Sequence, residues 1–424
     1  MTDVSSRDGL LAQVRGALSL AGTGLDRITG HVHGFHRAIS DIPFKTMAPL
    51  PGIQAGSEPT RLIHDGITDG VYGAVRGSMR LVFGAADQLL REAEKLAPPT
   101  PVPPNARRDL ALSAMAGFVG DDMAVKRNPL APRMGFYLQG ERLPLERQAL
   151  AQAYPDAQGR LVVFIHGLAC NESVWDFYTD VEQPDTHPYG PRLEQDLGYT
   201  PLYLRYNSGL HISRNGARLA RQLQRLAERW PRSVQEIVLV GHSMGGLVAR
   251  SAVAAGLRDD AAWVGRLSNV ICLGSPHLGA PLERWVDAGV RLMRRVPLSR
   301  PLADLLHSRS VGVKDLFHGY VDDSDWRGRQ THHDGGGALR IPKAPQARYH
   351  FFGCTLGVDE QDPVGRVIGD GLVLLPSSTA AHLADADTAV LFRTSHLRLL
   401  NHPVIYGLIR DALTGRRALR GELL

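Results

Sequence analysis

The sequence predicts an α/β protein with a doubly wound, mostly parallel sheet, an N-terminal helical hairpin and a helical lid-like insertion. Three observations support this fold class. Short apolar runs alternate with helix-like segments through most of the 424 residues. One of these runs leads directly into a Gly-x-Ser-x-Gly turn that is followed by a helix-forming segment. The N-terminal region instead carries two long apolar stripes at helical spacing.

The runs that predict strands are continuously apolar rather than alternating. That pattern is typical of parallel strands whose two faces are both covered by helices. Helical segments such as 216–229 lie between several of the runs. A leading hairpin is predicted from 134–138 and 143–145. The predicted strands are Leu161–Ile165, Pro201–Tyr206, Ile237–Val240, Val270–Leu273, Tyr349–Gly353 and Thr388–Phe392.

The two N-terminal stripes predict a helical hairpin with a Pro-rich bend between Pro43 and Pro59. Both stripes contain glycines, each of which costs about 1 kcal/mol relative to alanine inside a helix. We therefore interpret the glycines as a face for close helix packing, on the α/β domain or on a second copy of the chain. A surface that lies on a lipid or a polymer is the alternative. The stripes comprise Leu11, Val14, Leu18, Ala21, Leu25, Ile28, Val32, Phe35 and Ile39, then Ile63, Ile67, Val71, Val75, Met79, Val82 and Leu89.

These patterns divide the chain into three regions. The hairpin region is 1–97, a Pro-rich linker is 98–106, and the α/β domain is 107–424. Within that domain the segment from about 282 to 345 has apolar residues at helical spacing and is predicted to be a lid over the site. An extra pair of packing helices is an equally weighted interpretation.

Composition places the chain among globular proteins, with 43% hydrophobic and 21% charged residues. The net charge of +5 is modest, so we expect a solvated surface and no nucleic-acid partner. No apolar run reaches the length of about 18 residues that a membrane span needs, and residues 1–8 lack the features of a signal peptide. We expect a cytoplasmic protein, or one peripheral to a membrane or granule. Three widely spaced cysteines, Cys170, Cys272 and Cys354, indicate buried thiols rather than disulfides.

The segment from Ile237 to Gly246 predicts a nucleophile. Its apolar run enters Gly-His-Ser-Met-Gly, and a helix-forming sequence follows at once. A serine at the tip of so sharp a turn sits in strained backbone, and a Cβ at Gly241 or Gly245 would collide with the strand or the helix. The hydroxyl of Ser243 would then be exposed above the sheet, where a base can reach it.

A serine hydroxyl needs an orienting acid and a base, which in sheets of this kind follow the nucleophile in that order. Asp370 lies between two glycines after the strand 349–353 and is the predicted acid. Asp359, Glu360 and Asp362 are rivals in the same loop, and a plain Asp-Gly turn is the alternative interpretation.

His396 follows the last predicted strand and is the predicted base. His402 precedes Pro403 and is interpreted as a helix cap or a supporting residue, and His382 comes before the strand. Two backbone N–H groups are expected to bind the oxyanion. One belongs to Met244, directly after the nucleophile, and the other to Leu168 in the loop after 161–165. His166 is interpreted as a structural hydrogen-bonding residue.

As a set, these motifs resemble the α/β-hydrolase lipases. The resemblance is strongest to the bacterial triacylglycerol lipases and to the group related to the GPI inositol-deacylase, and it covers about 107–415. It implies that Ser243, Asp370 and His396 form the catalytic triad. It also implies that the loop at 274–281 shapes the pocket. Calcium-binding bacterial lipases have an acidic residue where this chain has Arg398, so a calcium site of that kind is not expected.

The sequence therefore predicts a serine carboxylic-ester hydrolase that acts on acyl or lipid-like esters through an acyl-enzyme. No metal or organic cofactor is expected. An acyltransferase or a polyester depolymerase with the same triad is the alternative. A third hypothesis makes the N-terminal hairpin a module that localises the esterase at a lipid or polymer interface, or that joins it into a homo-oligomer.

Overall fold

The computed structural model describes residues 9–47, 54–96, 102–179, 186–279, 310–327, 341–362, 365–366, 369–379, 386–415 and 422–423. The chain divides into two compact units. The first comprises 1–103, 123–130 and 285–309, and the second comprises 104–122, 131–284 and 310–424. Within the described residues, no helix is both long enough and apolar enough to cross a membrane.

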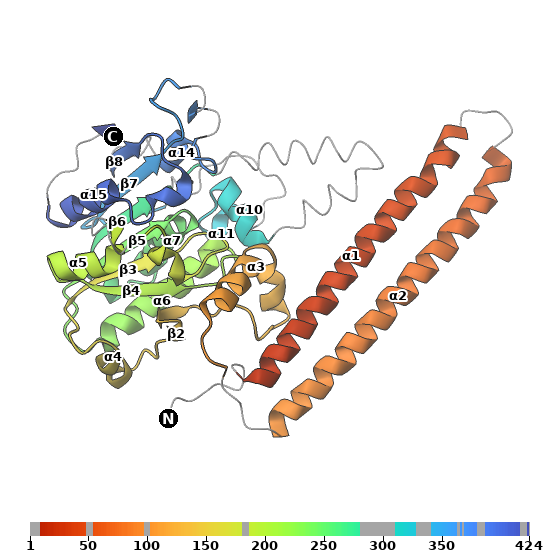
Figure 1. Ribbon diagram of the computed structural model, residues 1–424, viewed down its shortest axis with the longest axis horizontal. Helices are drawn as coiled ribbons and strands as arrows, with labels where there is room; N and C mark the ends of the chain where they lie inside the picture. Colours follow the sequence, from red (N-terminus) through yellow and green to blue (C-terminus); the bar gives the residue numbers. More distant parts are fainter. Residues whose placement is uncertain are drawn as a thin grey trace. The chain divides into compact units, whose positions relative to one another are not determined.

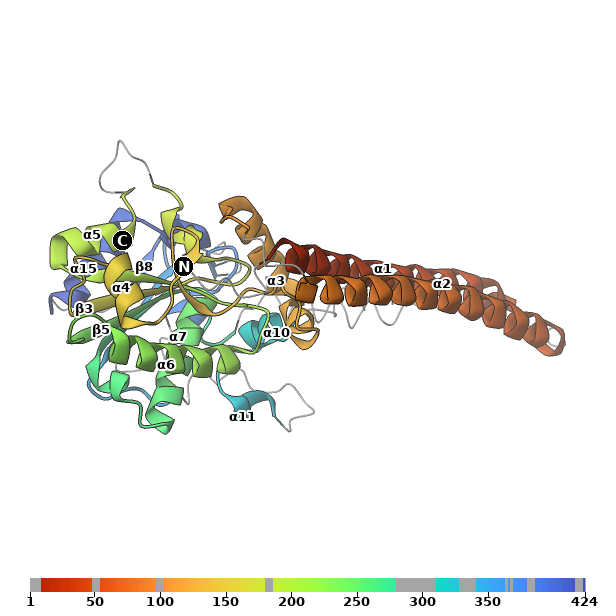
Figure 2. The same ribbon diagram turned by 90° about the horizontal axis from the view of Figure 1, so that it is seen from below.

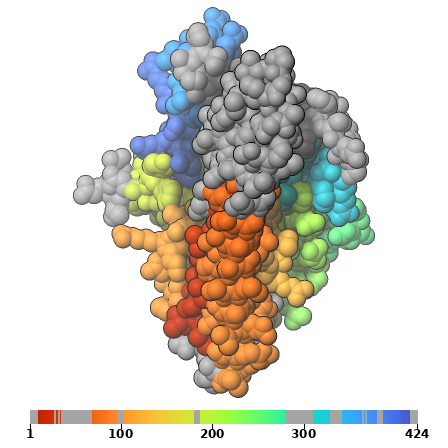
Figure 3. All heavy atoms as spheres, turned by 90° about the vertical axis from the view of Figure 1, so that its right-hand side faces the viewer, coloured from red at the N-terminus to blue at the C-terminus, as the bar shows by residue number. Residues whose placement is uncertain are grey.

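The first unit contains two long helices, α1 (Leu10–Met47) and α2 (Gln54–Leu96), which lie side by side (Figures 1 and 3). Gly22 lets them approach, since a Cβ there would stand 2.8 Å from Cγ of Phe83. Arg76 binds Asp26 across the pair at 2.9 Å. The bend was predicted to extend from Pro43 to Pro59. Both prolines instead lie inside the helices, so the two helices are longer than predicted.

Four glycines in the described part of α2 lie in open space. Around a Cβ built at Gly70, Gly73, Gly77 or Gly84, no atom lies within 4 Å. Several large apolar side chains of the same helix are exposed as well. They are Val71, Val75, Leu81, Val82, Leu89 and Leu96. The prediction that the glycines form a packing face toward the α/β domain or a second copy of the chain stays a prediction.

The second unit is built on one sheet, in which the described strands have the order β2-β1-β4-β3-β5-β6-β7-β8-β9. β1 runs antiparallel to both β2 and β4, and the remaining pairs are parallel. The strands are β1 (Gly135–Leu138), β2 (Glu141–Arg142), β3 (Arg160–Ile165), β4 (Thr200–Arg205), β5 (Glu236–His242), β6 (Leu267–Leu273), β7 (Arg348–Cys354), β8 (Ala386–Leu391) and β9 (Glu422–Leu423).

Helices cover both faces of this sheet, as Figure 2 shows. Successive residues of each central strand point to opposite faces. Leu161 and Val163 thus join the core beneath α6 and α7, whereas Val162 and Phe164 join the core beneath α5 and α15. The helices around the sheet are α3 (Ala106–Val125), α4 (Arg147–Ala153), α5 (Tyr189–Leu197), α6 (Ile212–Arg229), α7 (Met244–Arg258), α14 (Leu375–Ser378) and α15 (Pro403–Leu413).

The mostly parallel sheet, its strand order and the helices on both faces make this an α/β-hydrolase fold, which confirms the predicted fold class. The six central strands are also where the sequence predicts them. The second hairpin strand is not, because it lies at Glu141–Arg142 rather than at 143–145. α3 was not predicted at all. This helix packs through small residues, since Gly117 and Gly120 lie against neighbouring loops. Its sequence therefore lacks the clear apolar stripe by which a helix is predicted.

The predicted lid at 282–345 falls mostly outside the described residues. Two described helices belong to it, α10 (Val311–His318) and α11 (Asp323–Trp326). The buried Asp315 of α10 accepts hydrogen bonds from the ring of His211 at 3.0 Å and from the backbone N–H of Ile212 at 2.9 Å. This part of the insertion packs on the start of α6.

The core beneath α6 and α7 should carry much of the stability of the second unit. Leu239 of β5 is fully buried there. Leu239→Ala is expected to lower the free energy of unfolding by about 2–5 kcal/mol, through lost burial and the cavity that is left. Met115→Ala, at a partly exposed position of α3, should change it by less than about 1 kcal/mol. Urea denaturation measures both, and equal effects would contradict this account of the core.

Candidate active site

Ser243 sits at the junction between β5 and α7. β5 ends at His242, and α7 begins at Met244. Between them Ser243 has φ 54° and ψ −123°, a conformation that residues other than glycine seldom adopt. Such strain costs on the order of 1–3 kcal/mol and persists only where the surroundings enforce it. The turn therefore has the conformation that the sequence predicted for it.

The glycines around Ser243 explain how the turn is enforced. A Cβ at Gly245 would lie 2.1 Å from the carbonyl oxygen of Ile165, and one at Gly241 would lie 2.4 Å from the backbone of Gly245. Across the turn, a Cβ at Gly167 would come within 3.1 Å of Cβ of Ser243. The strand, the turn and the loop after β3 are thus in backbone contact, and no side chain fits between them.

Asp370 and His396 meet at the same edge of the sheet. Asp370 Oδ2 lies 2.7 Å from His396 Nδ1, and both residues are buried. The other carboxylate oxygen accepts the N–H groups of Leu372 and Val373 at 2.9 and 2.8 Å. Burial by itself would raise the pKa of Asp370, but the bonds from His396, Val373 and Leu372 outweigh it and hold that pKa below its ordinary value. The carboxylate is therefore ionised and fixed toward the ring.

The rival residues have other surroundings. The carboxylate of Asp359 accepts the N–H of Gln361, and that of Asp362 accepts the N–H of Val358. His402 caps α15 by accepting the N–H of Val404 at 3.3 Å, which matches its interpretation as a helix cap. Glu360 is exposed. His382 lies outside the described residues.

The carbonyl of His396 binds His242 in the elbow, and the ring of His396 makes no hydrogen bond to the serine hydroxyl. Because its Nδ1 faces a carboxylate, the proton sits on Nδ1, and Nε2 carries the lone pair. Nε2 is buried and has no hydrogen-bond partner among the described residues. The structure therefore brings Asp370 and His396 together but does not form the bond between Ser243 Oγ and Nε2. Such bonds are often long in the absence of substrate.

The predicted oxyanion donors belong to the loop after β3 and to the first residue of α7. Within the described part of the chain, neither the N–H of Leu168 nor that of Met244 has an acceptor. Met244 is the first residue of α7, where the aligned peptide dipoles favour negative charge. The carbonyl of Gly167 accepts from His166, so in the trans peptide the N–H of Leu168 points the other way.

His166 holds that loop in place. The backbone N–H of Tyr206 donates to His166 Nε2 at 3.2 Å, so Nδ1 must carry the proton that it gives to Gly167 at 2.8 Å. Burial lowers the pKa of His166 to about 3, so the ring is neutral. The tautomer is fixed from both sides, and His166 has the structural role that the sequence indicated.

The polar segment after β4 supports the same loop. Ser208 Oγ accepts the N–H of Ala169 at 3.0 Å, and Ala169 itself has a positive φ of 59°. Asn207 donates to the carbonyl of Gly120 in α3 at 2.8 Å. These contacts stabilise loops rather than line a site.

Two supporting residues escaped the sequence analysis. His242 Nε2 donates to the carbonyl of His396 at 3.2 Å, and burial lowers the pKa of His242 to about 3. Ser377 of α14 binds the loop after β6, accepting from Leu278 at 3.0 Å and donating to Gly279 at 2.8 Å. His242 stood inside the nucleophile motif, which was its only signal. No sequence pattern marks Ser377, because its side chain binds backbone groups that are about 100 positions away along the chain.

The cysteines matched their prediction in part. Cys272 and Cys354 are buried, and Cys170 is intermediate in exposure. Cys354 Sγ lies 3.7 Å from Asp370 Oδ2, which makes it a packing neighbour of the candidate acid. Burial, and then the negative charge of Asp370, raise the pKa of this thiol well above its ordinary value.

Comparison with protein families gives a match to part of the chain. Residues 156–331 match the PGAP1-like alpha/beta domain. The match confirms the resemblance to the group related to the GPI inositol-deacylase. The matched range includes Ser243 and ends before Asp370 and His396. No curated protein matches the chain.

Solved structures of lipases and esterases are also similar to the chain. An esterase of Pyrococcus furiosus has 14% identity, with 61% of this chain and 83% of that chain covered and a TM-score of 0.38. A lipase-esterase related protein from Clostridium acetobutylicum has 14% identity, coverages of 60% and 94%, and a TM-score of 0.35. A membrane phospholipase A, described as a bacterial virulence factor, has 13% identity, coverages of 61% and 79%, and a TM-score of 0.35.

Three buried histidines of the second unit predict acid sensitivity. Burial, as their first cause, lowers the folded-state pKa of His166 and His242 to about 3 and that of His350 to about 4. The unfolded chain takes up protons on them near pH 6.5, so as the pH falls from 6.5 to 5 it gains protons that the folded state does not bind. Unfolding free energy should therefore decrease, by up to about 1.4 kcal/mol per pH unit for each histidine.

Urea titrations at several pH values measure that decrease. His242→Gln removes one of the three groups and keeps a side-chain N–H for the carbonyl of His396. It should make the stability curve shallower between pH 6.5 and 5. A wild-type stability that does not change over this interval would rule out the neutral buried state of these rings.

Proposed function

We propose that the chain is a serine carboxylic-ester hydrolase that acts on acyl or lipid-like esters. The observation that carries the proposal is the combination of two features at one edge of the sheet. Ser243 stands in strained backbone at the tip of the turn after β5. Alongside it, the carboxylate of Asp370 binds and orients the ring of His396 at 2.7 Å. This residue set, in this chain order, is the one that acyl transfer through serine requires.

In the first half of the reaction, Nε2 of His396 takes the proton of Ser243 as its oxygen attacks the ester carbonyl. Asp370 holds the ring in the tautomer that leaves Nε2 free, and its negative charge stabilises the imidazolium that forms. The N–H groups of Leu168 and Met244 donate to the oxyanion of the tetrahedral intermediate. The intermediate collapses, the proton passes from His396 to the alcohol, and the acyl group stays on Ser243.

In the second half, water replaces the alcohol. His396 takes a proton from the water as it attacks the acyl-enzyme, and the same two N–H groups again bind the oxyanion. Collapse of this second intermediate returns the proton to Ser243 and releases the carboxylic acid.

The preference for acyl or lipid-like esters rests on the loops that carry the candidate acid and base. Four large aliphatic side chains on these loops are exposed, namely Leu356 (40%), Val358 (52%), Leu372 (47%) and Leu397 (38%). Leu372 follows the acid closely, and Leu397 is adjacent to the base. Apolar side chains in such places would gain by covering an acyl chain.

The proposal predicts that Ser243→Ala abolishes hydrolysis of p-nitrophenyl esters. We expect kcat/KM to fall by about 10⁴-fold or more, because no group replaces the nucleophile. Circular dichroism and thermal unfolding should be little changed, since alanine fits the same turn. Turnover at the wild-type rate would exclude Ser243 as the nucleophile. Analysis of products with an added alcohol distinguishes hydrolysis from acyl transfer.

Matched pairs of variants serve as controls for the acid and the base. Asp370→Asn is expected to reduce kcat on the order of 10⁴-fold, whereas Asp362→Asn, in the same loop, should not reduce it. In the same way His396→Gln should inactivate the enzyme, and His402→Gln should at most weaken the start of α15. If the losses followed Asp362 or His402 instead, the assignment of the acid or the base would be wrong.

A further inference from the structure

The helical hairpin of the first unit exposes apolar side chains in a regular pattern. On α1, every described residue that is exposed is apolar, and these residues follow one another in steps of three or four. Steps of this length place them on one side of the helix. The members of this α1 stripe are Leu10, Val14, Ala17, Ala21 and Leu25.

A matching stripe runs along α2. Its large side chains have exposed fractions between 40% and 89%, and small residues alternate with them in steps of three and four. Alternation at this spacing is typical of a helix face whose side chains fit into the spaces of another helix. The α2 stripe comprises Val71, Val75, Ser78, Val82, Ala85, Leu89 and Leu96.

The two stripes lie on the same side of the hairpin and together form its apolar face. The helices are antiparallel, since Arg15 binds Glu94 at 2.7 Å and Asp26 binds Arg76 at 2.9 Å. A two-fold axis perpendicular to the pair relates two antiparallel helices, so equal steps away from their contact lead to the same side. Three of the contact residues, Arg15, Asp26 and Arg76, are each directly preceded by a stripe residue, namely Val14, Leu25 and Val75.

The charged side chains of α2 lie away from the apolar face. Arg80 comes two positions before Val82, which places it on the opposite side of the helix at about 100° per residue. The arginines of α2 that the structure describes are also bound to carboxylates. The pairs are Arg76 and Arg80 with Asp26, and Arg91 with Asp87.

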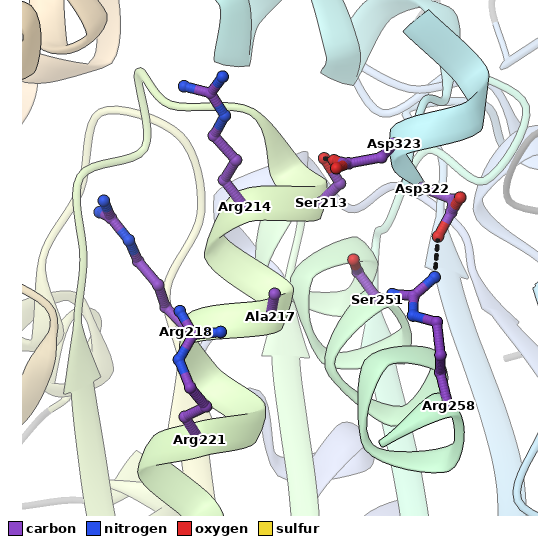
Figure 4. Close-up of a pocket in the computed structure, with 9 residues that line it drawn as sticks. All are labelled: Ser213, Arg214, Ala217, Arg218, Arg221, Ser251, Arg258, Asp322 and Asp323. Carbon is purple, nitrogen blue, oxygen red and sulfur yellow. Dashed lines mark hydrogen bonds and ion pairs between the residues drawn. The ribbon is translucent and has the colours of Figure 1, made fainter. Parts of the chain in front are cut away.

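A solvated helix of the same chain has a different surface. Every exposed residue of α6 is charged. Figure 4 shows three of these residues, Arg214, Arg218 and Arg221, with their side chains extending from that helix. By comparison, the apolar face of the hairpin has the composition of a surface that is covered by a partner.

The side chains of the apolar face suit another helix better than a lipid surface. Helices that lie on membranes carry bulky Leu, Phe or Trp on one side and a polar side that is rich in Lys and Arg. The apolar face instead alternates valine and leucine with alanine and serine, and the arginines opposite are bound to carboxylates. Small residues gain little from lipid, but they leave space for the side chains of a neighbouring helix.

The area of the apolar face is sufficient for a dimer. With a rise of about 1.5 Å per residue and a width of about 10 Å, the α1 stripe is about 22 Å long and the α2 stripe is about 38 Å long. Two copies that cover these stripes would bury about 600 Å² each, or about 1,200 Å² in total, which is the lower limit for specific protein interfaces.

We propose that two copies of the chain associate through their apolar faces and that their hairpins form a four-helix bundle. Both copies use the same face, so the association closes as a two-fold dimer. No like charges meet at the two-fold axis, because the stripes carry none. The bundle removes the valines and leucines of both stripes from water, which drives the association.

Sedimentation velocity of the full chain tests the dimer. At high concentration the wild type should sediment with twice the chain mass of 46.2 kDa, and it should dissociate on dilution. The variant V82E/L89E places two carboxylates in the apolar face of each copy and should be monomeric throughout. R80Q/R91Q is the matched control, because it lowers the net charge equally on the opposite side of α2, and it should keep the dimer.

Circular dichroism checks that both variants keep their helices. If V82E/L89E lost them, the single neutral variant L89Q should still raise the dissociation constant about tenfold or more. A wild type that is monomeric at every concentration would overturn the proposal, as would a dimer that V82E/L89E and L89Q both keep. Equal dissociation of V82E/L89E and R80Q/R91Q would show an effect of net charge and not of the apolar face.

Sedimentation with phosphatidylcholine vesicles tests lipid as the other occupant. The proposal predicts that neither the wild type nor V82E/L89E sediments with the vesicles. If the wild type is monomeric and sediments while V82E/L89E does not, the apolar face takes a lipid surface and the proposal is wrong. V82E/L89E leaves the candidate triad untouched and should hydrolyse p-nitrophenyl esters as the wild type does, so this test is separate from that of the proposed function.

Discussion

The strained backbone at Ser243 is the constraint on which the rest of the site depends. A side chain at φ 54° is stable there only because the turn is held on every side. Gly245 lies against the carbonyl of Ile165, and Gly167 lies against Ser243 itself. The sheet places these backbones in contact, since β3 and β5 are parallel neighbours whose carboxyl ends meet at one edge. The contacts between these neighbouring strands thus offset the backbone strain at Ser243.

Around the elbow, buried polar groups fix one another in single orientations. His166 is fixed as a neutral ring by Tyr206 on one side and Gly167 on the other. Asp370 is fixed by two backbone N–H groups, and it in turn fixes His396. Each of these hydrogen-bonded groups would be costly to bury without its partner, so loss of one partner would destabilise the others. This arrangement keeps Nε2 of His396 available beside Ser243.

Much of this could be predicted because it depends on local sequence. The central strands are continuous apolar runs, and the turn at Ser243 needs glycines at fixed positions, so both leave a clear pattern. Asp370 and His396 could be selected from their rivals because chain order and strand ends limit where they can lie. Elements whose stability comes from tertiary contacts were missed. α3 fits by small residues rather than by an apolar stripe, and Ser377 acts through backbone groups far away in the sequence.

The central claim is that Ser243 is a nucleophile activated by the pair Asp370–His396. Covalent labelling with a fluorophosphonate, followed by peptide mass spectrometry, tests it most directly, because the serine oxygen must attack phosphorus and expel fluoride. The account predicts one modified peptide, with the label on Ser243, and a labelling rate that falls sharply in His396→Gln but not in His402→Gln. Labelling of another residue, or an unchanged rate in His396→Gln, would contradict it.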